Sequence, residues 1–208
     1  GAEMAMAGWE AVANHESYMG LVEFGVGLIP AGGGCKEVLR RKVNPVMQTP
    51  NADVVPVLQA AFEQVALAKV GTSAWENKEL GYLAPNDLIA MNGDHRLALA
   101  QHRALQLARI GARPPEVEKI YAAGRDVYSA LVVGVKSLHW GAYATAHDVV
   151  IAKKLAYVLC GGDISAPAWV DPWYILDLER EAFLSLLGEE KTRERMTAML
   201  TTGKPLRN

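Results

Sequence analysis

Two glutamates near the start of the chain could carry acid and base chemistry. Glu3 stands in Gly-Ala-Glu-Met-Ala and Glu23 in Leu-Val-Glu-Phe-Gly, so each carboxylate has apolar or small neighbours. Burial raises the pKa of a carboxyl group toward the working pH, where the group can give or take a proton. Two such groups that converge on one site can divide the acid and base roles. The plainer alternative, which composition alone favours, puts Glu3 on an exposed helix face and Glu23 on an edge strand.

The segment Pro30-Ala31-Gly32-Gly33-Gly34 precedes a predicted helix and could hold an anion. Backbone N–H groups at a helix start have no intrahelical partner and attract negative charge. The segment is not a dinucleotide-binding fingerprint, because Gly25-x-Gly27 lacks a third glycine at the required distance. The same glycines also suit a tight packing turn, which is the favoured interpretation without further context.

The histidines and cysteines form no metal-binding or nucleophile motif. None of the five histidines stands at the spacing of a zinc site, and there is no Cys-x-x-Cys. We therefore predict no metal site and assign the histidines to the surface or the core. Cys35 lies near a helix start, which can lower a thiol pKa, but it has no neighbouring histidine in the sequence and is expected to fill space in the core.

Composition narrows the class of protein. Half of the 208 residues are hydrophobic and the formal net charge is −2. That balance is typical of a packed protein and gives no reason to expect nucleic acid or an anionic membrane as a partner. Two cysteines make no disulfide framework, so we expect a cytoplasmic location. The chain opens without an initiator methionine, and we expect it to be part of a longer protein.

The elements that would position the glutamates are mostly helices. Short strands are expected between residues 12 and 24, and Leu88 to Met91 is a strand candidate. Residues 44–56, with three prolines, are expected to connect two elements. Ser73 or Thr72 is a predicted N-cap for a short helix that ends at Gly81. Apolar spacing and helix-forming composition predict the other helices, at 3–9, 36–43, 57–69, 94–110, 127–140, 145–159, 174–187 and 189–200.

Two segments together resemble the enoyl-CoA hydratase/isomerase (crotonase) family. They are Gly1-Ala-Glu-Met-Ala-Met6 and Leu21-Val-Glu-Phe-Gly-Val-Gly-Leu-Ile-Pro-Ala-Gly-Gly-Gly34. In that family one catalytic glutamate opens a helix and a second follows 20 residues later, ahead of a Gly-x-Ile-Pro-Gly-x-Gly-Gly segment, and Glu3 and Glu23 fall in that register. The resemblance covers residues 1–111. The remainder is similar to bacterial 3-hydroxyacyl-CoA dehydrogenases that carry a crotonase-like domain.

The resemblance implies an α/β fold of the ClpP/crotonase type. Residues 1–115 would be the C-terminal half of a crotonase-like domain, and residues 116–208 a mostly helical extension, so that helix dominates this fragment. Glu3 and Glu23 would hold one water and act as acid and base in hydration, whereas one carboxylate would shuttle the proton in an isomerase. Ala31 and Gly32 would contact the substrate. Both oxyanion donors would precede Gly1, so the fragment alone is expected to be inactive.

The resemblance also implies partners and cofactors. The substrate would be an acyl-CoA thioester, and the protein would form homo-oligomers. No cofactor is expected in this fragment, whereas NAD would bind an upstream domain of the intact protein. Two alternatives stay open: a catalytically silent crotonase-like scaffold, and a helical interaction domain without CoA chemistry.

Overall fold

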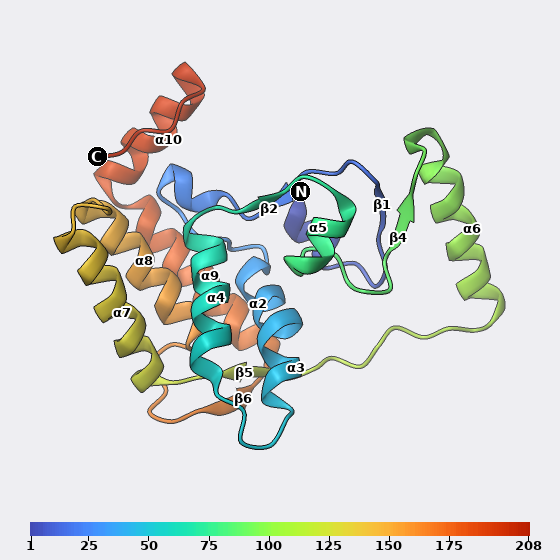
Figure 1. Ribbon diagram of the computed structural model, residues 1–208, viewed down its shortest axis with the longest axis horizontal. Helices are drawn as coiled ribbons and strands as arrows, with labels where there is room; N and C mark the ends of the chain where they lie inside the picture. Colours follow the sequence, from blue (N-terminus) through green and yellow to red (C-terminus); the bar gives the residue numbers. More distant parts are fainter. The chain divides into compact units, whose positions relative to one another are not determined.

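The computed structural model describes residues 1–208, and helix dominates it (Figure 1). Six short strands form three separate two-stranded sheets. This confirms the predicted helix-rich mixture of helix and strand. The chain divides into two compact units: residues 1–20 with 70–117, and residues 21–69 with 118–208. The expected division at residue 115 stays a prediction. What the packing adds is that residues 21–69 belong to the same unit as the C-terminal helices.

The first unit contains two of the small sheets. β1 (Val12–Asn14) pairs in parallel with β4 (Leu88–Ala90), and β2 (Met19–Gly20) pairs antiparallel with β3 (Val70–Gly71). Its helices are α1 (Ala2–Met6), α5 (Ala74–Glu79) and α6 (Arg96–Arg109), the last preceded by the 3₁₀ turn η3 (Gly93–His95). The strands predicted between residues 12 and 24 are confirmed at Val12–Asn14 and Met19–Gly20, and the strand candidate near residue 88 is confirmed at Leu88–Ala90.

The predicted cap of α5 is also confirmed. Ser73 Oγ accepts a hydrogen bond from the Glu76 backbone N–H at 3.1 Å, which satisfies one of the free amides of the first turn. The helix ends just before Gly81, as its sequence predicted. A small apolar core of Ala13, Ala74 and Leu83 joins this helix to β1.

The second unit is a layered packing of helices. It comprises η1 (Glu23–Val26), α2 (Gly34–Val38), the π-helical turn η2 (Leu39–Val43), α3 (Asn44–Met47), α4 (Val54–Ala66), β5 (Ile120–Ala122), α7 (Arg125–Trp140), α8 (Ala146–Leu159), β6 (Ala168–Val170), α9 (Pro172–Leu187) and α10 (Glu190–Thr202). β5 and β6 pair antiparallel. α8 packs against α4, α7 and α9 and is the central helix (Figure 1).

Apolar residues spaced four apart explain this packing. Val127, Leu131 and Val135 are the buried residues of α7, so one stripe of that helix faces the core. Ile151 and Leu155 of α8 are fully buried. α8 also begins with a capping box, in which Thr145 and Asp148 each bond the other's backbone N–H.

Three sequence expectations were wrong in detail. The helix expected at 36–43 begins at Gly34 and continues through η2 and α3 to Met47, so residues 44–47 are not part of a connection. The Asn44 side chain explains this, because it donates to the Lys119 carbonyl at 2.7 Å and accepts from the Tyr121 N–H at 2.9 Å. Glu23 opens a 3₁₀ turn rather than lying on an edge strand.

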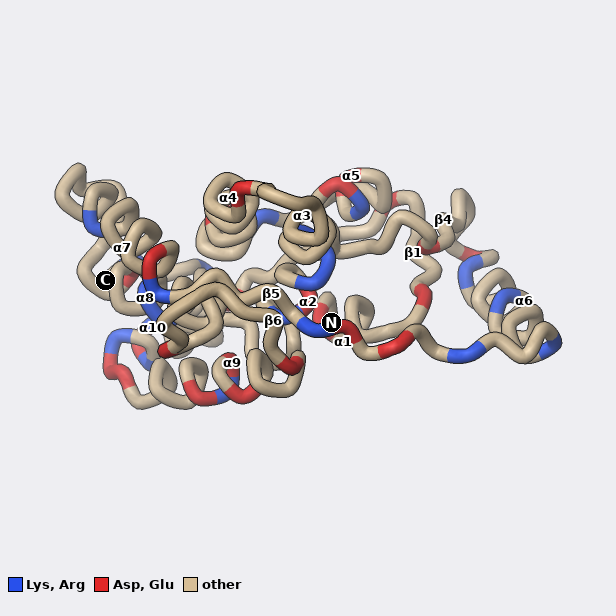
Figure 2. The backbone as a smooth tube through the Cα atoms, turned by 90° about the horizontal axis from the view of Figure 1, so that it is seen from below, with Lys and Arg blue, Asp and Glu red and all other residues tan.

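Acidic and basic residues are interspersed along α9 and α10 (Figure 2), in keeping with the small net charge. No helix is long and apolar enough to cross a bilayer.

Candidate functional site

Glu3 lies in the first turn of α1 and is half-buried. The helix is a single short turn, closed by a bond from the Ala7 N–H to the Glu3 carbonyl at 2.9 Å. Met6 on the same turn is 1% exposed, whereas Met4 is 82% exposed. α1 therefore has one buried and one exposed side, and Glu3 stands between them.

Glu23 is the first residue of η1 and is also half-buried. Its backbone carbonyl accepts a bond from the Leu28 N–H at 3.0 Å, and the Gly27 N–H bonds the Phe24 carbonyl at 3.1 Å. Gly27 ends the turn with a φ of 86°, a left-handed conformation that favours glycine. Glu3 belongs to the first unit and Glu23 to the second, so the predicted pairing of the two carboxylates stays a prediction.

The amides at the start of α2 bind an internal carboxylate. Glu179 on α9 is 0% exposed, and its two carboxylate oxygens accept from the N–H groups of Gly33 at 2.8 Å and Lys36 at 2.6 Å. The sequence offered an anion site at this helix start as the alternative to the favoured packing turn, and the anion found there is a side chain of the same chain. No local signal could have identified Glu179, which lies 146 residues after Gly33. Ala31 and Gly32 immediately precede this bonded helix start, and their role in substrate binding stays a prediction.

Both cysteines are 0% exposed. This burial raises the pKa of the Cys160 thiol to about 12. For Cys35, burial fits the expected role as core filler, and its Sγ lies 3.7 Å from the Pro30 carbonyl oxygen. The structure places no group of three His, Cys, Asp or Glu side chains where they could hold a metal ion.

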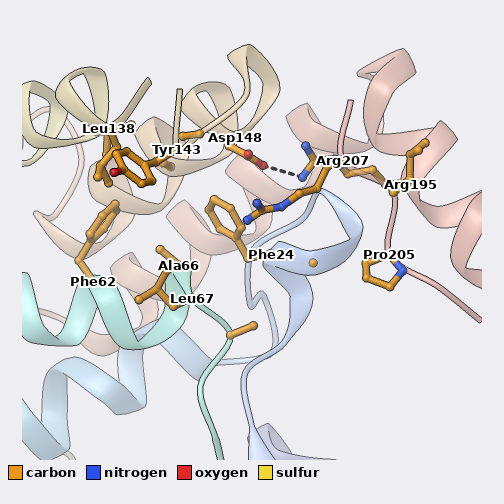
Figure 3. Close-up of a pocket in the computed structure, with 16 residues that line it drawn as sticks. Phe24, Phe62, Ala66, Leu67, Leu138, Tyr143, Asp148, Arg195, Pro205 and Arg207 are labelled. Carbon is orange, nitrogen blue, oxygen red and sulfur yellow. Dashed lines mark ion pairs between the residues drawn. The ribbon is translucent and has the colours of Figure 1, made fainter. Parts of the chain in front are cut away.

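An apolar pocket of about 630 Å³ lies next to the Glu23 turn (Figure 3). The two residues that follow Glu23, Phe24 and Gly25, form part of its wall. The other walls come from α4, α7, α8, α10 and the segment after α10, and include Phe62, Ala66, Leu67, Leu138, Tyr143, Ala152, Pro205 and Leu206. Apolar side chains dominate this lining, so the pocket is suited to an apolar ligand or to the apolar part of a larger one.

The pocket contains one neutralised charge pair and one additional cation. Arg195 Nη1 lies 2.8 Å from the Asp148 carboxylate, and the Arg195 side chain is only 2% exposed. Burial by itself would raise the pKa of Asp148, but the Thr145 N–H and the Arg195 guanidinium outweigh it and hold that pKa below its ordinary value. Arg207 is exposed and lies on the same side of the pocket as this pair (Figure 3).

A buried hydrogen-bond chain connects the Glu23 turn to α8 and α10. The Thr192 hydroxyl donates to the Gly27 carbonyl at 2.9 Å, and His147 Nε2 lies 2.9 Å from the same hydroxyl oxygen. Thr192 is 0% and His147 3% exposed. Sequence reasoning assigned the histidines to surface or core and gave Thr192 no role, because nothing local marks this contact.

Burial lowers the pKa of His147, and the positive charge of Arg195 adds to that effect. The charge of Lys191 acts in the same direction, whereas Glu189 and Asp148 raise the pKa by less than the lowering. These effects together favour the neutral form of His147.

No family model matches the chain. The chain is 45% identical over 212 residues to a Bacillus subtilis (strain 168) protein named "Probable 3-hydroxyacyl-CoA dehydrogenase". That alignment covers all of this chain and 26% of the relative, so the chain spans about a quarter of the length of the curated relative it matches.

Proposed function

We propose that this chain is part of a longer enzyme of fatty-acid β-oxidation, which acts on acyl-CoA thioesters. The enzyme would be a 3-hydroxyacyl-CoA dehydrogenase with a crotonase-like domain, and Glu3 and Glu23 would be its acid/base pair. The observation that carries the proposal is the position of Glu23, which is followed directly by two residues that line an apolar pocket. The relative that aligns with the whole chain is named "Probable 3-hydroxyacyl-CoA dehydrogenase", which supports the dehydrogenase part of the proposal.

Hydration of an α,β-unsaturated thioester requires two proton transfers. One carboxylate takes a proton from water as the oxygen adds to the β-carbon, and a carboxylic acid delivers a proton to the α-carbon. In an isomerase a single carboxylate would move one proton between two carbons. The apolar pocket beside Glu23 would receive the acyl chain, because burying its methylene groups is favourable at about 0.8 kcal/mol each.

Other groups that the reactions need would lie elsewhere in the longer protein. The N–H donors that stabilise the thioester oxygen, and the NAD of the dehydrogenase step, would be bound outside these 208 residues. The expected self-association and cytoplasmic location also stay predictions for that protein.

Glutamine substitutions in the full-length protein test the proposal. Glu3→Gln and Glu23→Gln each keep the shape of the side chain and remove its ability to take a proton. We expect either variant to lower hydration of crotonyl-CoA by about 10²–10⁴-fold, the range of general acid–base catalysis. The assay follows the loss of the conjugated thioester absorbance.

Two controls make the result specific. Glu16→Gln changes an exposed glutamate of the unit that contains Glu3 and should leave turnover unchanged. The NAD-dependent oxidation of a 3-hydroxyacyl-CoA, measured in the same preparations, should also stay constant. Wild-type hydration by Glu23→Gln would contradict the proposal and would favour a silent scaffold.

A further inference from the structure

We propose that Thr192 and His147 are positioning residues that hold the Glu23 turn in its working conformation. The inference rests on the proposed function, because it concerns the placement of Glu23. The Thr192–Gly27 bond spans 165 residues of sequence and is fully buried. It fastens α10 to the end of a four-residue turn that begins at Glu23.

The hydrogen positions in the Gly27–Thr192–His147 hydrogen-bond chain follow from the donors available. A threonine hydroxyl has one hydrogen, and here it is donated to the Gly27 carbonyl oxygen. The contact between Thr192 Oγ1 and His147 Nε2 must therefore use a hydrogen on the histidine. His147 thus fixes the direction of the Thr192 hydroxyl, which in turn fixes the Gly27 carbonyl.

The contact between α10 and the turn is close as well as polar. A Cβ atom added at Gly27 would lie 2.9 Å from Thr192 Oγ1 and 3.0 Å from Thr192 Cα. The left-handed backbone of Gly27 brings the chain directly against α10, while the Leu28 N–H closes onto the Glu23 carbonyl. A change at Thr192 is therefore transmitted to the backbone of Glu23 through only a few bonds.

The test compares Thr192→Val with Thr192→Ser in the full-length protein. Valine keeps the volume and removes the hydroxyl, whereas serine keeps the hydroxyl. For Thr192→Val we expect kcat for enoyl-CoA hydration to fall by about tenfold or more, because small misplacements of a catalytic group have large effects. KM should change by less than about twofold, since the substrate pocket keeps its lining. Thr192→Ser should restore kcat.

Hydrogen exchange provides a readout that does not depend on turnover. A peptide covering residues 21–30 contains the amides of Gly27 and Leu28, which close the turn. Thr192→Val should speed their exchange by about tenfold or more, as expected for local opening. Thr192→Ser should leave it near the wild-type rate. His147→Leu is a second variant: it removes the donor but not the Thr192 hydroxyl, so we expect smaller changes in the same direction.

Each outcome decides the inference. Wild-type exchange in Thr192→Val overturns it. Faster exchange with unchanged kcat, in a protein that Glu23→Gln inactivates, also overturns it and leaves Thr192 a structural role alone. If His147→Leu matches the wild type in both measurements, His147 has no part in positioning. Equal turnover by wild type and Glu23→Gln refutes the proposed function and the catalytic part of this inference, while exchange still shows whether Thr192 holds the turn.

Discussion

Replacing Arg195 by leucine should destabilise the protein strongly. The Arg195 side chain is 2% exposed, and its guanidinium pairs with Asp148 at 2.8 Å and donates to Asn208 Oδ1 at 2.9 Å. Leucine removes the cation and leaves the Asp148 carboxylate, which is 11% exposed, without its counter-ion. Breaking a buried ion pair from one side costs about 3–5 kcal/mol. That is a large share of the about 5–15 kcal/mol that stabilises a typical domain.

Urea unfolding followed by circular dichroism measures this cost. Arg193→Leu, an exposed arginine on the same helix, is the matched control and should change the free energy of unfolding by no more than about 0.5 kcal/mol. Asp148→Asn and the double variant complete a thermodynamic cycle. Because the single arginine variant leaves a charge buried alone, the double variant should cost about 1–3 kcal/mol less than the sum of the single changes. A cost below about 1 kcal/mol for Arg195→Leu, or simple additivity, would refute the reasoning.

Two further predictions concern the Thr192 contact. Gly27→Ala should lower the free energy of unfolding by about 2–4 kcal/mol, because alanine is strained at a φ of 86° and its Cβ would press on Thr192. Gly25→Ala is the control: the space around its Cβ is open, so the free energy of unfolding should change little. Equal unfolding midpoints for the two variants would contradict this prediction. Since the pKa of His147 is lowered in the fold, the unfolded chain takes up its proton first as pH falls. Stability should therefore decline as pH drops below the ordinary value of 6.5. Urea titrations between about pH 5 and pH 8 check this, and a His147→Leu variant with an equally steep decline would show that another group is responsible.

Sequence patterns predicted the helices that are defined by residues close together in the sequence. The Ser73 cap lies within one turn of its helix, and the apolar stripe of Val127, Leu131 and Val135 lies within a single helix. The sequence was therefore sufficient to predict α5 and α7. The same is true of the 94–110 helix, which the structure shows at Arg96–Arg109. At the site, the sequence singled out Glu23, and the structure puts an apolar pocket beside it.

Features that depend on distant partners could not be predicted. Proline in residues 44–56 indicated a connection, but Asn44 bonds backbone groups of residues 119 and 121, and this tertiary contact fixes α3. β5 and β6 are three residues each, and they are strands because they pair with each other, with Tyr121 opposite Trp169. Short segments of this kind take their structure from their partner, and a single sequence does not name that partner.

The Glu179 contact limits where an acyl-CoA could be held. A carboxylate that accepts from the N–H groups of Gly33 and Lys36 already supplies the negative charge that this helix start favours. A phosphate group would have to displace a fully buried side chain to use the same amides. The hydrogen bonds of Glu179 instead hold the start of α2 against α9. In the proposed enzyme, the charge attraction for the anionic part of an acyl-CoA would then come from elsewhere. Under that proposal Arg207, which is exposed beside the apolar pocket, would supply it, whereas the charge of Arg195 is neutralised by Asp148.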